Sequence, residues 1–260
     1  MCMLAILRNV VDGWPVILAA NREEFYDRQG TPPEVWVGSP TIVAGRDPKA
    51  GGTWLGVNEY RLLVAITNRP KERVTREPRS RGLLCLELLA CHSAGEAQDR
   101  AMGLLRQGHY AGCNVLAVDH AATCLVESGD AIVSSTPGVG VYVVTTNGLN
   151  QPGDTRAALA AAELRACPRW SLESCLAQLM RICGQHAAGD RPPICLHAPD
   201  RGTVSSSIVA FGTDSADLRW LHAQGPPCRS RFIDYSMLFQ RLAPRSTTAN
   251  LVAGPVPKTL

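Results

Sequence analysis

The sequence predicts an α+β protein and, more specifically, a layered αββα sandwich. Short β-branched runs gather in clusters, helical patterns occur in pairs between those clusters, and the regular strand–helix alternation of a βαβ fold is missing. With 260 residues, of which 45% are hydrophobic, the chain can bury the core of one domain. We expect a single domain over residues 1–243 and a flexible C-terminal tail over 244–260, where Pro, Ser, Thr and Gly are frequent.

Two apolar runs at the N-terminus predict a β-hairpin. Residues 2–11 and 14–20 are rich in Leu, Ile, Val and Ala, and a D-G pair between them favours a tight turn. In such a hairpin the end of the second run returns beside the start of the first. The four polar residues at 21–24 are therefore expected to lie next to Cys2.

Shorter strands follow the hairpin. A stretch rich in Pro and Gly at 25–40 predicts a loop, and strand-like runs follow at 42–44, 53–57 and 62–67. The charged stretch at 70–80 predicts a surface loop.

The rest of the chain carries paired helices between groups of strands. Helices are expected over 81–91, 96–107, 154–166 with Asp154 as N-cap, and 171–183 with Ser171 as N-cap. Strands are expected over 114–118, 124–127, 131–134, 139–146, 194–197, 204–211 and 218–222.

Charge and composition exclude several classes of partner. The net charge of +3 is too small to indicate a nucleic acid or an anionic membrane as partner. No apolar stretch reaches the roughly 18–20 residues of a membrane span, and the N-terminal run lacks the preceding basic residues of a signal peptide. The ten cysteines are scattered without a C-x-x-C pair, which is typical of free thiols in a reducing compartment. We therefore expect a cytoplasmic protein; nothing in the sequence indicates its oligomeric state.

Cys2 is the first candidate catalytic residue. Removal of the initiator methionine, which is usual before a small residue, would give Cys2 a free α-amine. A thiol pKa is about 8.5 and an α-amine pKa about 7.7–8, so the amine can take the proton of the thiol near neutral pH. The alternative is a small residue at the start of a strand, because buried cysteines are common.

The polar end of the hairpin supplies further candidates. Alternate residues of a strand face opposite sides, so Asn21 and Glu23 share one face, whereas Arg22 and Glu24 share the other. A carboxylate that faces Cys2 would hold the α-amine, and Arg22 would lower the thiol pKa. The alternative is a solvated strand end with a weak Arg–Glu ion pair.

Two asparagines complete the candidate site. Asn68 and Asn147 each follow an apolar strand and a threonine, and side-chain amides are suitable donors to the oxyanion of a carbonyl under attack. The alternative for each is an ordinary turn asparagine.

No metal site is predicted. Cys183, His186, Cys195 and His197 are potential ligands, but their spacing matches no common zinc pattern. Nucleotide-binding glycine motifs and H-E-x-x-H are also missing.

Several short motifs resemble those of the NRDE family, the transport-and-Golgi-organisation type. The segments are A-N-R-E-E at 20–24, A-G-R-D at 44–47, G-G-T-W-L-G-V-N at 51–58 and T-N-R at 67–69, with looser matches S-R-G at 80–82, T-N-G at 146–148 and G-T-V-S-S-S at 202–207. That family resembles the cysteine N-terminal nucleophile hydrolases, which include penicillin V acylase, bile salt hydrolase and acid ceramidase. The resemblance implies an αββα sandwich with Cys2 as nucleophile, an acidic residue near its amine, and asparagines near the oxyanion.

The hydrolases usually carry Arg-Asn-x-Asp at the end of the second strand. If Asn21 matches that asparagine, Glu23 matches the catalytic aspartate and Ala20 stands in the place of the arginine. The predicted function is a cysteine N-terminal nucleophile hydrolase or acyltransferase that acts on an amide, ester or thioester of a small acyl substrate, without a cofactor. The alternative is a non-catalytic protein on the same scaffold that binds or transports haem or acyl lipids.

Overall fold

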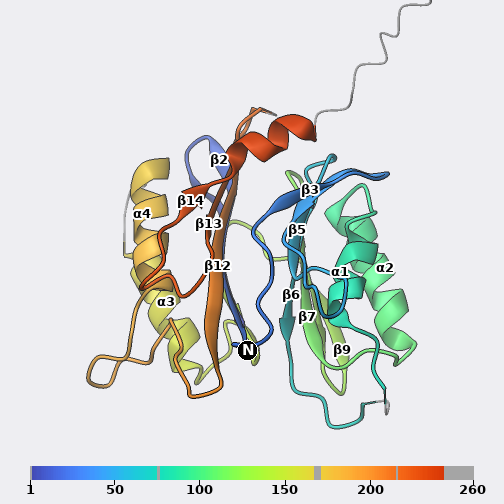
Figure 1. Ribbon diagram of the computed structural model, residues 1–260, viewed down its shortest axis with the longest axis horizontal. Helices are drawn as coiled ribbons and strands as arrows, with labels where there is room; N and C mark the ends of the chain where they lie inside the picture. Colours follow the sequence, from blue (N-terminus) through green and yellow to red (C-terminus); the bar gives the residue numbers. More distant parts are fainter. Residues whose placement is uncertain (1, 75–76, 167–170, 215, 243–260) are drawn as a thin grey trace, which may run out of the picture.

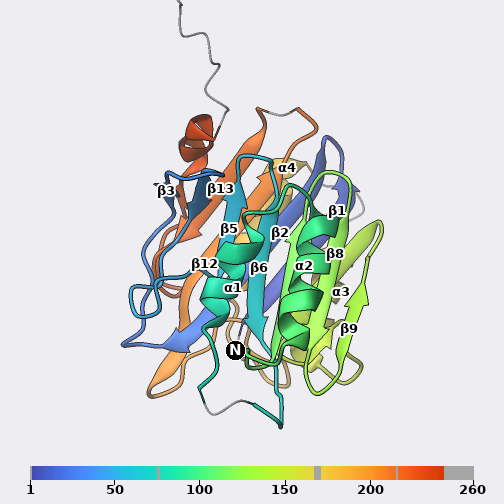
Figure 2. The same cartoon turned by 90° about the vertical axis from the view of Figure 1, so that its right-hand side faces the viewer.

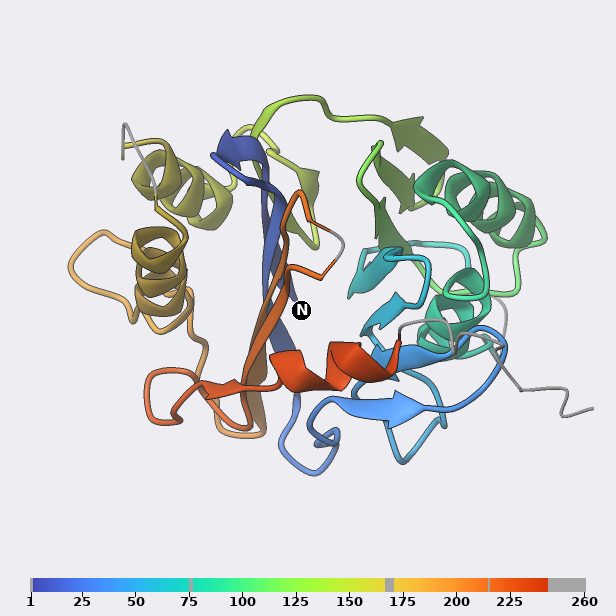
Figure 3. The ribbon, with the colours of Figure 1, turned by 90° about the horizontal axis from the view of Figure 1, so that it is seen from above.

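Four layers make up the protein. The computed structural model describes residues 2–74, 77–166, 171–214 and 216–242, so the expected tail at 244–260 lies outside the described residues. A pair of helices covers each outer side, and two sheets lie face to face between them (Figures 1 and 3). The αββα sandwich predicted from the order of the elements is confirmed.

The first sheet contains the N-terminal hairpin at its centre. Its seven antiparallel strands are, in spatial order, β11 (Gly148–Leu149), β10 (Gly140–Thr145), β1 (Met3–Val11), β2 (Trp14–Phe25), β12 (Arg201–Phe211), β13 (Leu218–Ala223) and β14 (Ile233–Asp234). Because β1 and β2 are central strands in a four-layer protein, their side chains are covered on both faces.

The second sheet runs through the chain in sequence order. Its seven antiparallel strands are β3 (Glu34–Trp36), β4 (Ile42–Ala44), β5 (Leu55–Asn58), β6 (Leu63–Asn68), β7 (Cys113–Val118), β8 (Thr123–Ser128) and β9 (Ile132–Ser135).

Helices cover the outer faces, as the amphipathic patterns predict. The helices are α1 (Arg81–Leu88), α2 (Ala94–Arg106), α3 (Thr155–Arg165), α4 (Leu172–Cys183) and the 3₁₀ helix η1 (Ser236–Arg241). Figure 2 shows α1 and α2 lying across the second sheet, whereas α3 and α4 lie against the first sheet in Figure 1. The predicted caps are confirmed: Asp154 accepts from the N–H of Ala157, and Ser171 accepts from the N–H of Ser174.

The side chains of β1 and β2 divide between two cores. Met3 and Ala5 pack towards α3 and α4, whereas Leu4 and Ile6 pack between the two sheets. This alternation places Cys2, one residue before Met3, on the face between the sheets.

Strand β2 is longer than the apolar pattern predicts. It continues through the polar residues to Phe25, because β12 pairs with it from Val16 to Phe25. Arg22 and Glu23 are consequently buried, at 6% and 5% exposure. Polarity alone had suggested that the strand ends at Ala20.

Other differences concern short elements. The strand expected at 194–197 is wrong: this segment makes one isolated bridge, and the carbonyl of Ile194 accepts hydrogen bonds from side chains instead. Strands β3, β11 and β14 and the helix η1 were not predicted, because their two to six residues are too short to show a period. None of the helices in the described residues is long and apolar enough to span a bilayer.

Candidate active site

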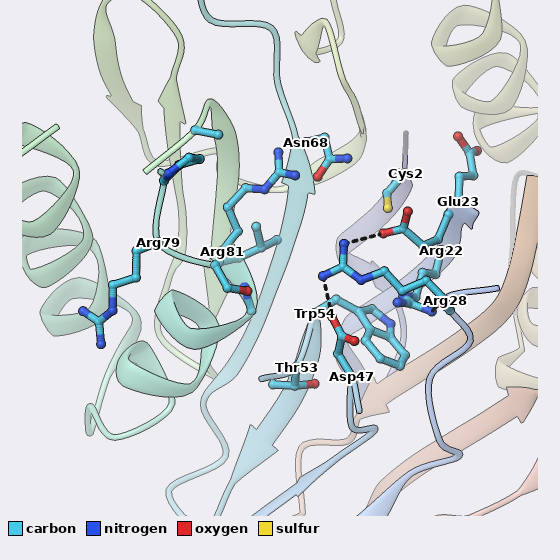
Figure 4. Close-up of a pocket in the computed structure, with 16 residues that line it drawn as sticks. Cys2, Arg22, Glu23, Arg28, Asp47, Thr53, Trp54, Asn68, Arg79 and Arg81 are labelled. Atoms are coloured by element: carbon cyan, nitrogen blue, oxygen red, sulfur yellow. Dashed lines mark hydrogen bonds and ion pairs between the residues drawn. The ribbon is translucent and has the colours of Figure 1, made fainter. Parts of the chain in front are cut away.

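The Cys2 thiol opens into a pocket between the two sheets. The pocket has a volume of about 310 Å³, and both sheets contribute to its walls. Figure 4 shows Cys2 on one side and Asn68 on the other, pointing into the same space. Five of the seven predicted residues line it, namely Cys2, Arg22, Glu23, Glu24 and Asn68.

The hairpin register explains how three of these residues meet. Met3 pairs with Asn21 across β1 and β2, so Cys2 lies beside Arg22. Arg22 and Glu24 alternate with Asn21 and face the space between the sheets. The pair on the Cys2 face is therefore Arg22 and Glu24.

The environment of Cys2 favours the neutral thiol. Burial raises the pKa of the Cys2 thiol, and the negative charge of Glu23 adds to the rise. Arg22 acts in the opposite direction because its positive charge stabilises the thiolate. A nucleophile in this position therefore needs a base beside it.

Glu23 points towards the helix layer, where it meets α3. Arg156 Nη2 forms an ion pair with Glu23 Oε1, and the Glu23 side chain is only 3% exposed. Burial raises the pKa of the Glu23 carboxyl, whereas Arg156 opposes that rise. Arg156 is fixed in turn, because it donates to the carbonyls of Pro193 and Ile194.

Trp54 supports Arg22 from the second sheet. The Arg22 guanidinium lies 4.2 Å from the centre of the Trp54 ring, a cation–π distance. The ring has room because two glycines face it: a Cβ on Gly30 or Gly45 would lie 2.2 or 3.0 Å from Trp54. The A-G-R-D and G-G-T-W-L-G motifs thus position the arginine beside Cys2.

A second arginine bridges two carboxylates at the pocket wall. Arg28 lies 2.7 Å from Asp47 Oδ2 and 3.4 Å from Glu24 Oε2 (Figure 4). Glu24 therefore faces the Cys2 side of β2 but is held by Arg28.

The opposite wall depends on a close contact between two backbones. A Cβ on Gly52 would lie 2.3 Å from the carbonyl carbon of Gly82, and the N–H of Thr53 donates to the Gly82 carbonyl. This contact places the start of α1 at the pocket. Arg81 lines the wall there and donates to the carbonyl of Gly112, at 3.0 Å.

The T-N-R motif at the end of β6 serves two purposes. Thr67 accepts from the amide of Asn114, and Arg69 donates to Asn114 and Glu127, so these residues stabilise the end of the sheet. Asn68 lies between them and faces the pocket, and within the described residues its amide makes no hydrogen bond. Its amide is therefore open to a ligand.

Two predicted residues do not line the pocket. Asn21 is buried under α4, where its amide donates to the carbonyls of Cys183 and Ile194. Asn147 is exposed, and its amide donates to Asp154, the N-cap of α3. In this structure both asparagines support neighbouring segments.

The remaining residues of the pocket, and Arg156 behind Glu23, had weaker signals in the sequence. Asp47, Trp54 and Arg81 all lie in the motifs quoted for the family resemblance, which suggested their importance but no role. Arg28 lies in a predicted loop, and Arg156 lies on an Ala-rich helix. No local pattern distinguishes either arginine from a surface residue.

Comparisons with known proteins agree with the fold. The chain is 28% identical over 241 residues to a Transport and Golgi organization protein 2 homolog of Bos taurus, covering 78% of this chain and 84% of that protein. Its fold resembles an N-acylethanolamine-hydrolyzing acid amidase ortholog of Caenorhabditis elegans, with a TM-score of 0.56 and 14% identity, over 90% of this chain and 99% of that one. It also resembles penicillin V acylase of Agrobacterium tumefaciens, with a TM-score of 0.53 and 12% identity, over 94% and 88% of the two chains.

These two likenesses, at 12% and 14% identity, concern the fold, which is the αββα sandwich of the N-terminal nucleophile hydrolase type. Residues 1–193 match the family described as Transport and Golgi organisation 2. The matched segment includes the N-terminal hairpin, the pocket walls and Arg156. The chain belongs to the Transport and Golgi organisation 2 family.

Proposed function

We propose that this protein is a cysteine N-terminal nucleophile hydrolase or acyltransferase that acts on an amide, ester or thioester of a small acyl substrate. The observation that carries the proposal is the Cys2 thiol, which opens into an inter-sheet pocket beside Arg22 and opposite an unengaged Asn68 amide. A nucleophile, a positive charge and an oxyanion donor are then present around one space.

In the proposed reaction the Cys2 thiolate attacks the carbonyl carbon and forms a C–S bond. The carbonyl oxygen becomes an oxyanion, to which Asn68 donates. The oxyanion collapses, the C–N, C–O or C–S bond to the leaving group breaks, and the leaving group takes a proton from the α-ammonium. Water, or an acyl acceptor, then attacks the thioester and releases the thiol of Cys2.

Activation of Cys2 depends on its α-amine. Removal of Met1 places an amine on the same residue as the thiol, and this amine is the base that the buried thiol needs. Glu23 and Glu24 lie in the pocket wall and would hold the ammonium that forms. If Asn21 matches the asparagine of the hydrolases, Glu23 matches their aspartate and is one methylene longer.

The pocket lining favours a small polar or anionic substrate. Arg22 and Arg81 both line the pocket, and within the described residues neither forms an ion pair with a carboxylate. A volume of about 310 Å³ is at the lower end of ligand sites, which range from roughly 300 to 1,000 Å³. This small volume and the charged lining support a small acyl substrate over haem.

Mass spectrometry of the native protein tests the proposal. Intact protein should begin at Cys2 and should gain one acyl adduct, mapped to Cys2, on treatment with a thiol-reactive acyl probe. Retained Met1, or an adduct spread over the other thiols, would contradict it. A haem titration is the companion experiment: a Soret shift at micromolar haem that persists in Cys2→Ala would favour the binding alternative.

Replacement of Asn68 separates the two predicted oxyanion donors. Asn68→Ala should lower kcat by about 10²–10³-fold with little change in Tm, because its amide makes no hydrogen bond to any residue that the structure describes. Asn147→Ala should lower Tm instead, because the amide supports the N-cap Asp154. Steady-state kinetics and thermal unfolding of both variants show which asparagine acts in catalysis and which supports the fold. The opposite pattern would assign the oxyanion role to Asn147.

A further inference from the structure

Four side chains suited to bind a metal converge beside the C-terminal end of α4. His186 follows that helix, Cys195 and His197 lie in the segment that leads into β12, and Cys228 lies between β13 and β14. Their ligand atoms all lie within 4.8 Å of one another. None of the four lines the Cys2 pocket.

The separations match those of a tetrahedral zinc site. The Sγ atoms of Cys195 and Cys228 are 3.6 Å apart, and Nε2 of His197 lies 3.6 Å from the first and 3.3 Å from the second. Tetrahedral zinc, with Zn–S about 2.3 Å and Zn–N about 2.0–2.1 Å, places two sulfurs about 3.8 Å apart and sulfur and nitrogen about 3.5 Å apart. Three ligands therefore already form one face of such a tetrahedron.

His186 supplies the fourth ligand. Its ring lies 5.1 Å from the ring of His197, between centroids, and the side chain is exposed. Carboxylates are not part of the cluster. Two thiolates with two imidazoles select zinc over magnesium or calcium, which prefer oxygen ligands.

We propose that His186, Cys195, His197 and Cys228 bind one Zn²⁺ ion as a structural site. Four protein ligands fill a tetrahedron and leave no position for water or substrate, as in structural rather than catalytic zinc sites. The site joins three segments that lie outside the helices and strands, two of which are already joined because the N–H groups of Ile194 and Cys195 donate to the Gln185 carbonyl.

The zinc site would also stabilise the residues that hold Glu23 beside the Cys2 pocket. Cys195 directly follows Ile194, whose carbonyl accepts from Arg156 and from Asn21. Arg156 pairs with Glu23, the acidic residue beside Cys2. A metal bound to Cys195 therefore fixes the neighbouring Ile194 carbonyl. That carbonyl orients Arg156, the ion-pair partner of Glu23.

The sequence pattern missed this site because it suggested the wrong fourth ligand. Cys183 lies three residues before His186, but it is the last residue of α4 and its side chain is buried in the core. The fourth ligand is instead Cys228, which lies in a loop 31 residues after His197. A Cβ on Gly184 would lie 3.6 Å from the Cα of Cys228, which shows how closely this loop approaches α4.

Metal analysis of the full-length protein tests the proposal. The protein is purified under reducing conditions, loaded with Zn²⁺, freed of excess metal on a desalting column and measured by inductively coupled plasma mass spectrometry. About one zinc per chain is expected. Loading with Co²⁺ should give the thiolate charge-transfer band and the intense visible bands of tetrahedral cobalt.

Two variants and one control make the assignment specific. Cys228→Ser and His197→Ala should each lose at least about tenfold in zinc affinity, measured by competition with a chromophoric chelator. Cys183→Ala is the matched control and should keep one zinc, because its thiol is outside the cluster. Zinc should raise the Tm of the unaltered protein by about 4 °C or more, and it should slow amide exchange in residues 184–200.

Other outcomes would overturn the site. Less than about a tenth of a zinc per chain after loading, or octahedral cobalt spectra, would exclude a tetrahedral site. A Cys195–Cys228 disulfide that persists under reducing conditions and blocks zinc binding would assign the pair to a redox role. Loss of zinc in Cys183→Ala with retention in Cys228→Ser would assign the ligands by sequence spacing instead.

Discussion

Replacement of Cys2 by alanine should lower acyl transfer from the best substrate of a short-chain ester, amide and thioester panel by at least about 10³-fold. The reason is that Cys2 supplies both the thiol and, after removal of Met1, the base. Alanine and serine at this position still permit methionine removal, so Cys2→Ala and Cys2→Ser keep the α-amine and change only the nucleophile. Initial rates of all three proteins, with N-termini verified by mass spectrometry, provide the measurement.

Cys124→Ala is the matched control for loss of a thiol. Cys124 is also a free thiol, but it is buried on the α1 and α2 side of the second sheet, away from the pocket. This variant should retain the rate of the unaltered protein. Equal activity of Cys2→Ala and Cys124→Ala would exclude Cys2 as the nucleophile. It would favour the alternative of a non-catalytic binding protein.

The parts of the site that local sequence predicts are those within the N-terminal hairpin. The two-residue turn pairs Val11 with Trp14, and an uninterrupted ladder from that pair would place Glu23 opposite Cys2. A bulge between Arg8 and Val11 shifts the register by one residue, so that Arg22 lies beside Cys2 instead. The sequence therefore predicts that the polar end of the hairpin meets Cys2, but it does not predict which alternate pair faces the thiol. Asn68 was identifiable from local sequence, because a polar residue at the end of a buried strand has few reasons to be there.

Contacts between distant segments account for what the sequence could not predict. Arg156 meets Glu23 across 133 residues, and Cys228 joins His186, Cys195 and His197 in the proposed zinc site. Asn147 was expected in the site because it ends a strand, yet Asp154, a helix cap seven residues later, accepts its amide hydrogen bond. Periodicity describes which face of an element is buried, but it does not identify the partner on the other element.

Replacement of Arg156 by methionine should destabilise the protein by about 3 kcal/mol at neutral pH, because it removes the guanidinium from a buried carboxylate. Glu23 is 3% exposed in its side chain and Arg156 is 15% exposed, so solvent replaces little of the lost charge. Methionine keeps much of the apolar stem of arginine. Urea unfolding, monitored by tryptophan fluorescence across a range of pH, measures the loss.

The pH dependence of the stability loss in Arg156→Met tests whether the Glu23 carboxylate causes that loss. The folded-state pKa of Glu23 is already raised by burial, and loss of Arg156 removes an opposing charge and raises it further. A folded pKa above the unfolded value means that the folded state binds the proton more tightly. The destabilisation by Arg156→Met should therefore be fully present above the folded pKa and should shrink as the pH falls through it.

The double variant Glu23→Gln/Arg156→Met provides the control, because glutamine has the same size and no charge. It should be more stable than Arg156→Met at neutral pH, and its difference from Glu23→Gln should not change with pH. A loss in Arg156→Met that is constant with pH, and that the glutamine does not relieve, would assign the effect to the hydrogen bonds of Arg156 with Pro193 and Ile194. If the carboxylate is the cause, the protein keeps a buried charge beside Cys2 at a cost in stability, which is expected where a charge is kept for chemistry.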